Sequence, residues 1–230
     1  MSAVYAKSEG VTLVGGGPLG AETLRRALKY APFLVAADGG ADQLMAMGHP
    51  PDLAIGDFDS ISNETRAILG PDRLHEIEAQ DDTDFDKALR AVEAPFVLAL
   101  GVSGGRLDHS LAAMNTLLRN PERRVIVDSG FDLCVVLPPR LSLDLAAGTR
   151  VSLFPMAPVA CESKGLEWPI KGLPFAPLGK IGTSNRATGG TVTLTSDAPA
   201  MLLLVPETEL DALLRALRDA PVWPASAHAQ

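Results

Sequence analysis

The sequence predicts an α/β fold in which a Rossmann-like, mostly parallel sheet with helices on both faces is followed by an all-β sandwich domain. Three observations lead to this prediction. Short apolar runs alternate with segments of helical periodicity up to Asp128. Beyond that residue the helical spacing disappears, and prolines and glycines punctuate short runs that alternate between apolar and polar residues. The two halves therefore have the patterns of an α/β domain and of an antiparallel β domain.

Buried strands are predicted where short apolar runs are bounded by turn residues. Such runs have no polar face, which is typical of parallel strands covered by helices on both sides. The predicted strands are residues 11–14, 33–37, 53–55, 96–100 and 125–127.

Helices are predicted between these strands, because apolar residues recur there at helical spacing. Several of these segments have Gly, Pro, Ser or Asp at the entrance, which are common residues at helix starts. The predicted helices are residues 19–30, 41–47, 62–69, 84–92 and 107–119. Alternating strands and helices predict successive crossover units in one sheet.

The second half is predicted to contain strands at residues 133–137, 150–154 and 191–195, with a final amphipathic helix at 207–218. We place a domain boundary near Pro138 and Pro139. The predicted organisation is an α/β domain at 1–138, a β-sandwich domain at 139–220 and a flexible tail at 221–230.

Composition excludes some classes of partner. The net charge of −8 disfavours a general affinity for nucleic acid or for an anionic membrane surface, since both need a basic patch. No apolar run is long enough to span a membrane, and no export signal is visible near Met1. We expect a cytoplasmic protein in which Cys134 and Cys161 are reduced and structural.

Aspartates follow several predicted strands. Asp38, Asp57 and Asp59 come directly after apolar runs, Asp81, Asp82 and Asp84 open the helix that carries Lys87, and Asp108 follows a glycine-rich turn. Any one of them alone is adequately explained as a helix cap or turn residue. Together they are expected at the carboxyl edge of the sheet, where ligands of such folds bind. Converging carboxylates repel one another unless a cation lies among them, and hard oxygen ligands favour Mg²⁺.

Two glycine-rich loops are candidates for phosphate binding. Residues 15–20 match G-x-G-x-x-G, with Asp38 at the spacing of a ribose-binding acid, and Pro18 is predicted to start a helix whose amides favour an anion. The alternative is a tight turn between strand and helix. Residues 101–109 place Ser103 and Arg106 beside Asp108, and the alternative for the last two is a surface ion pair.

The order of several motifs resembles the thiamine pyrophosphokinase family. The segments are ADGGA at 37–41, PDLAIGDFDS at 51–60, QDDTDFDK at 80–87 and GGRLDH at 104–109. GLEW at 165–168 and GTSN at 182–185 are similar to the thiamine-binding segments of that family. The resemblance covers nearly the whole chain, apart from the first ten residues and the part after Pro206.

The resemblance implies a homodimer whose α/β catalytic domain and β-sandwich thiamine-binding domain build active sites at the subunit interface. The reaction would transfer the diphosphoryl group of ATP to the hydroxyl of thiamine, with Mg²⁺ as cofactor. Asp38, Asp57, Asp59, Gln80, Asp84 and Asp108 carry over as site candidates. Asp57 and Asp59 are the preferred magnesium ligands and Asp81 is a third candidate, while the adjacent Asp82 leaves the liganding acid of that segment open.

Roles for the other candidates follow from substrate chemistry. Arg106 and Lys87 are expected to neutralise phosphate charge, together with backbone amides after Ser103, and one unidentified aspartate accepts the proton of the alcohol. Trp168 is expected to stack on the cationic aromatic substrate, with a core tryptophan as the alternative. Thr183, Ser184 and Asn185 are expected to contact the aminopyrimidine edge, unless they only form a hairpin connection.

Three competing functions remain open from the sequence. A related pyrophosphokinase would use the same acidic half on another alcohol, such as a hydroxymethylpterin. An NAD-binding oxidoreductase would use the first glycine loop and need no Mg²⁺. A nucleotide sensor would keep the fold without turnover.

Overall fold

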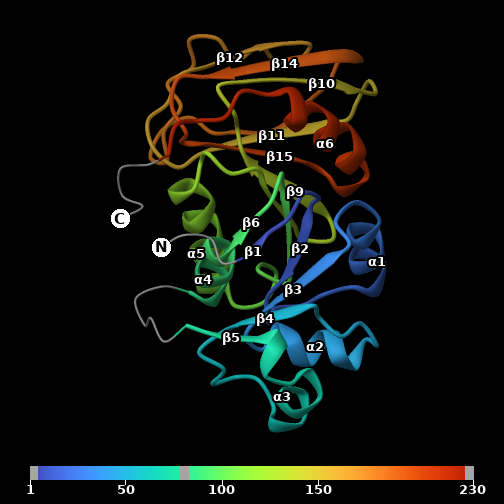
Figure 1. The fold of residues 1–230 in the computed structure, drawn as a ribbon. Helices are drawn as coiled ribbons and strands as arrows, with labels where there is room; N and C mark the ends of the chain where they lie inside the picture. The colour runs from blue at the N-terminus through green and yellow to red at the C-terminus, as the bar shows by residue number, and fades with distance from the viewer. Residues whose placement is uncertain (1–4, 78–82, 226–230) are drawn as a thin grey trace. The chain divides into compact units, whose positions relative to one another are not determined.

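The structure, a computed structural model, describes residues 5–77 and 83–225, and contacts divide the chain into two units (Figure 1). The first unit comprises Met1–Thr116 and Val125–Gly130, and the second comprises Leu117–Arg124 and Phe131–Gln230. The chain has a mixed α/β fold. Among the described residues, no helix combines the length and apolar character that crossing a membrane requires.

Parallel strands form the sheet of the first unit, in the order β8, β7, β2, β3, β4, β5. Four of these strands are buried along their whole length, which is why they read as continuous apolar runs. The bounds are β2 Val11–Val14, β3 Phe33–Ala37, β4 Leu53–Gly56, β5 Leu74–Glu76, β7 Val97–Leu100 and β8 Val125–Asp128. A short β1 (Tyr5–Ala6) pairs with β6 (Val92–Glu93). The three-residue β5 was not predicted, because it is half exposed and too short for a pattern.

Helices connect these strands, and Figure 1 shows α1 on one side of the sheet and α4 and α5 on the other. Both α2 and α4 contact β3, and α4 also contacts β4. The bounds are α1 Ala21–Tyr30, α2 Gly40–Ala46, α3 Asn63–Leu69, η1 Pro71–Arg73, α4 Asp84–Ala91 and α5 Leu107–Arg119. The prediction that Pro18 begins a helix is wrong. Gly20 caps α1, and the chain before it is held by a hydrogen bond from the Gly17 amide to the Gly101 carbonyl, 2.7 Å long.

The second unit consists of antiparallel strands followed by a helix. One group has the order β13, β11, β15, β9, and the other has the order β10, β14, β12. The bounds are β9 Asp132–Val136, β10 Arg140–Leu145, β11 Arg150–Pro155, β12 Cys161–Lys164, β13 Gly182–Arg186, β14 Gly190–Ser196 and β15 Met201–Pro206, then η2 Glu207–Glu209 and α6 Leu210–Asp219. Strand β9 precedes the predicted boundary at 138 but pairs with β15 of this unit.

Both cysteines are free and buried, as predicted from their apolar surroundings. Burial raises the pKa of the Cys134 thiol to about 12, and it also raises the pKa of Cys161. Neither thiol is therefore a nucleophile at neutral pH.

Candidate active site

Three aspartates, Asp38, Asp57 and Asp59, form an acid group at the carboxyl ends of β3 and β4. Asp38 follows β3, and Asp57 and Asp59 follow β4. One carboxylate oxygen of each lies within 4.8 Å of the other two. Asp38 is only 2% exposed, whereas Asp59 lies in solvent and accepts a 2.7 Å hydrogen bond from the Ser60 hydroxyl. The predicted convergence of these acids at one edge of the sheet is thus present in the structure.

The backbone that carries this group is strained. Asp38 has a φ of 42° and Phe58, between the other two acids, has a φ of 60°. Aspartate tolerates the left-handed region, but a buried phenylalanine there is unusual, and strain of this kind concentrates at functional sites. Gly56 allows the arrangement, because a Cβ at that position would lie 2.9 Å from the Cβ of Asp38. The chain is folded locally to bring carboxylates together.

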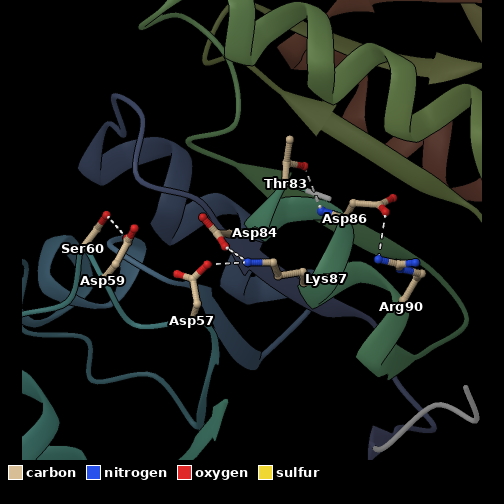
Figure 2. Close-up of polar contacts among 8 residues, drawn as sticks. All are labelled: Asp57, Asp59, Ser60, Thr83, Asp84, Asp86, Lys87 and Arg90. Atoms are coloured by element: carbon tan, nitrogen blue, oxygen red, sulfur yellow. Dashed lines mark hydrogen bonds and ion pairs between the residues drawn. The ribbon is translucent and has the colours of Figure 1, made fainter. Parts of the chain in front are cut away.

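Lys87 lies beside Asp57 and Asp84 (Figure 2). Its side chain points from α4 toward Asp57 and Asp84, and its Nζ donates to Asp57 Oδ2 at 2.7 Å and to Asp84 Oδ1 at 2.9 Å. The lysine is 3% exposed. Thr83 caps α4 by accepting the Asp86 amide, so the first turn of that helix places Asp84 and Lys87 on the side of Asp57. Two carboxylates already hold the ammonium that was predicted to contact phosphate.

The electrostatics of the acids differ. Burial raises the pKa of Asp38, and the nearby carboxylates of Asp84 and Asp59 also raise it, although a hydrogen bond with Ser60 opposes them. The hydrogen bond from Lys87 lowers the pKa of Asp57. Burial alone would lower the pKa of Lys87, but its bonds to Asp57 and Asp84 raise it overall. The lysine is therefore a permanent counter-charge for Asp57.

A pocket of about 670 Å³ opens beside Asp38 and Asp84 in the first unit. Both glycine loops form its walls. Within these walls, Gly15–Gly17 and Gly101–Ser103 pack directly against each other. A Cβ on Gly17 would lie 2.6 Å from the Gly101 carbonyl oxygen, so only glycine permits this contact. Other lining residues are Asp38, Ser60, Thr83, Asp84, Ser103, Arg106 and His109.

The second loop is only partly arranged as predicted. Ser103 lines the pocket, and its buried Oγ has no hydrogen-bond partner among the described residues. The Gly104 amide that follows it is already bonded to Ser110 Oγ at 3.3 Å. Arg106 makes the surface pair that was the alternative reading, with Nε and Nη2 donating to Asp108 at 3.1 and 2.6 Å. This pairing lowers the pKa of Asp108.

The predicted thiamine-contact residues lie in the second unit, on β13 and the segment before it. Trp168 is 51% exposed, so it is not a core tryptophan. The Arg186 guanidinium lies 5.9 Å from the centroid of its ring. Thr183, Ser184 and Asn185 belong to strand β13 rather than to a hairpin connection. Thr183 and Ser184 are exposed, and Ser184 has a φ of 64°, whereas Asn185 is buried.

Some predicted residues lie outside the described part of the chain, namely Gln80, Asp81 and Asp82. Sequence reasoning missed Ser60 and Thr83, which line the pocket. Thr83 had a detectable signal, since Thr followed three residues later by an acid marks a helix start. Asp38, expected to bind substrate, lies within the acid group itself.

Comparison with known proteins is consistent with this arrangement. Residues 24–127 match the family model described as thiamin pyrophosphokinase, catalytic domain, and residues 140–201 match that described as thiamin pyrophosphokinase, vitamin B1 binding domain. Thiamine pyrophosphokinase 1 of Oryza sativa subsp. japonica is 28% identical over 215 residues, which are 76% of this chain and 81% of the relative. Thiamine pyrophosphokinase 1 of Arabidopsis thaliana is 26% identical over 204 residues, or 74% and 76% of the two chains.

Solved structures share the fold. The crystal structure of thiamine pyrophosphokinase from Bacillus subtilis has a TM-score of 0.71 at 21% identity and covers 88% of this chain and 100% of that one. The yeast thiamin pyrophosphokinase structure has a TM-score of 0.74 at 16% identity, with 94% of each chain covered.

Fold and site together define a mixed α/β protein with an acidic, glycine-walled pocket. The two matched regions cover more than half of the sequence, and the chain belongs to the thiamine pyrophosphokinase family.

Proposed function

We propose that this chain is a thiamine diphosphokinase, which transfers the diphosphoryl group of ATP to the hydroxyl of thiamine and releases AMP. The observation that carries the proposal is the acid group beside a glycine-walled pocket, within the region that matches the catalytic family model. A pocket of about 670 Å³ falls within the size range of small-ligand sites. We infer that the first unit is a Rossmann-like catalytic domain and that the second is a β-sandwich for thiamine.

The acid group fits a magnesium ion. Oδ1 of Asp38 and Oδ1 of Asp57 are both buried, and neither has a hydrogen-bond partner among the described residues. Unpaired buried carboxylate oxygens are costly unless a cation completes them. Asp38, Asp57 and Asp59 would hold the ion, with Asp81 as a further candidate from the sequence. A bound Mg²⁺ would neutralise phosphate charge and make the attacked phosphorus more electrophilic.

The remaining residues of the first unit position the nucleotide. The Ser103 hydroxyl, which has no hydrogen-bond partner among the described residues, would bind a phosphate oxygen, and Arg106 would exchange its pair with Asp108 for phosphate contacts. Lys87 keeps Asp57 ionised and fixes the orientation of the Asp57 and Asp84 carboxylates. Gln80 is a further candidate for substrate binding from the sequence, and one aspartate of the site, which the sequence does not identify, accepts the proton of the attacking hydroxyl.

In the second unit the half-exposed indole of Trp168 offers a flat apolar face, which suits a cation with two aromatic rings. Thr183 and Ser184 lie exposed on the adjacent strand and supply hydroxyl groups for polar contacts. We further propose that two copies of the chain associate and that residues of both subunits build each site.

The decisive experiment incubates the protein with ATP, Mg²⁺ and thiamine and identifies the products. AMP with thiamine diphosphate is expected, whereas ADP with thiamine monophosphate would show that a different bond breaks. Turnover of a hydroxymethylpterin but not of thiamine would assign the chain to the related pyrophosphokinases.

Asp59→Asn should abolish turnover and leave the fold intact, since Asp59 is exposed. Asp72→Asn, which changes another exposed acid that belongs neither to the acid group nor to the pocket, is the matched control.

A further inference from the structure

The side chain of Asn185 is buried in the second unit, and its polar atoms form hydrogen bonds there. The residue is 6% exposed. Its Nδ2 donates to the Trp168 carbonyl at 2.7 Å, and its Oδ1 accepts the Trp168 amide at 3.2 Å and the Arg186 amide at 2.8 Å. The donors and acceptors of these three bonds fix which end of the side-chain amide is oxygen. Little hydrogen-bonding capacity is left for a substrate.

Trp168 shows the opposite pattern, because its backbone is clamped while its indole is half exposed. The segment before it is also held to β13, by the Glu167 amide donating to the Arg186 carbonyl at 2.8 Å, and to the residue after β13, by a bridge between Leu166 and Ala187. Tryptophan usually buries most of its area, so an indole presented to solvent on a fixed backbone is an arrangement suited to contact with a ligand.

We propose that Asn185 is a positioning residue, which sets the indole of Trp168 for stacking on thiamine and does not itself touch the substrate. This inference rests on the proposed function and changes the role that the sequence predicts for Asn185. The two-point clamp on the Trp168 peptide groups fixes the backbone from which the indole extends. An aromatic surface that is already oriented loses less conformational freedom when the ligand binds.

The first test separates binding from turnover. Asn185→Ala should raise the KM for thiamine about tenfold, the effect expected from losing the two hydrogen bonds that hold Trp168. The KM for ATP and the kcat at saturating thiamine should change less than about threefold, since the clamp contributes to binding alone. Asn185→Asp should not rescue the KM, because its second oxygen would face the Trp168 carbonyl that now accepts a hydrogen bond.

Thr188→Val is the matched control. Thr188 Oγ1 donates to the Gly165 carbonyl at 3.2 Å, so this change removes another side-chain bond to the same segment. The KM for thiamine should stay within about twofold of the wild-type value, because the Thr188 amide still bonds to Gly165 at 2.9 Å.

A second readout needs no turnover. The chain contains two tryptophans, so Trp223→Phe leaves Trp168 as the only indole. In that background, Asn185→Ala should lower the fluorescence anisotropy of Trp168 and increase its quenching by acrylamide. Unchanged anisotropy and quenching would overturn the positioning role, whether or not the wild-type protein converts thiamine. Failure of the wild-type protein to convert thiamine would separately refute the proposed function.

A double-mutant cycle distinguishes positioning from direct contact. In a Trp168→Ala background, Asn185→Ala should have no further effect on the KM for thiamine, because the group that it positions is gone. A second tenfold loss in that background would show that Asn185 acts on the substrate directly, and the inference would then be wrong.

Discussion

The two oxygens of Asp57 are in different environments. Oδ2 accepts the Lys87 ammonium at 2.7 Å, whereas Oδ1 is buried without a described partner. A single carboxylate thus combines a fixed counter-charge with a free ligand atom. No cation in the described part of the chain pairs with Asp38, and burial raises its pKa. The lysine supplies the positive charge that keeps the Asp57 carboxylate ionised beside its acidic neighbours.

Loss of this lysine should therefore destabilise the protein more than loss of a surface cation. We expect Lys87→Met to lower the free energy of unfolding by about 2 kcal/mol or more without Mg²⁺, since Asp57 and Asp84 lose their partner. Urea unfolding would measure it. Lys171→Met removes an exposed pair with Glu162 and should cost no more than about 0.5 kcal/mol. Equal losses in the two variants would show that Lys87 is not required as a counter-charge.

At the scale of elements, Asp42 in α2 is tied to the start of α3. Its carboxylate accepts the Ser62 amide at 2.8 Å and the Ser62 hydroxyl at 2.7 Å, and Ser62 in turn caps α3. Burial raises the pKa of Asp42, but hydrogen bonds from Thr65 and Ser62 outweigh it, and the pKa is lowered overall. The ionised form of Asp42 is therefore bound more strongly in the folded state than in the unfolded chain.

This lowered pKa predicts a pH-dependent contribution to stability. It is fully present above the unfolded pKa of about 3.9 and is lost as the pH falls through the lower folded pKa. Asp42→Asn should lower the free energy of unfolding by about 1 kcal/mol at neutral pH, and the difference from wild type should shrink toward zero in acid. Urea titrations at several pH values would measure this. A difference that does not change with pH would rule out the ionised carboxylate as the source.

Strands are predicted best from the sequence where they are buried on both faces, because only apolar residues then fit. Strands such as β2 and β7 are buried along their whole length and appear as apolar runs. Strands β12 and β13 are polar and partly exposed, so their residues read as loops. The acid group could be predicted because carboxyl ends of parallel strands share one edge. The inward direction of Asn185 could not, since it depends on pairing with Trp168, 17 residues away in the chain.

At the scale of the whole molecule, α5 carries an apolar pair that the described structure leaves uncovered. Leu107 and Leu111, one helical turn apart, are 73% and 58% exposed. They lie in the same helix as the pocket residue His109. Exposed apolar patches of this kind commonly mark contact surfaces between subunits, and most homo-oligomers are symmetric dimers.

If this pair lies in a dimer interface, Leu111→Glu should convert the dimer into a monomer, which sedimentation equilibrium would measure. The reason is that burying an unpaired charge in an interface costs several kcal/mol. Turnover should fall by about tenfold or more. Ile68→Glu on α3, at 59% exposure, introduces the same charge at an equally exposed apolar position and should leave both mass and activity unchanged. A wild-type protein that sediments as a monomer while turning over thiamine would refute the dimer. A Leu111→Glu protein that stays dimeric would instead place the interface elsewhere.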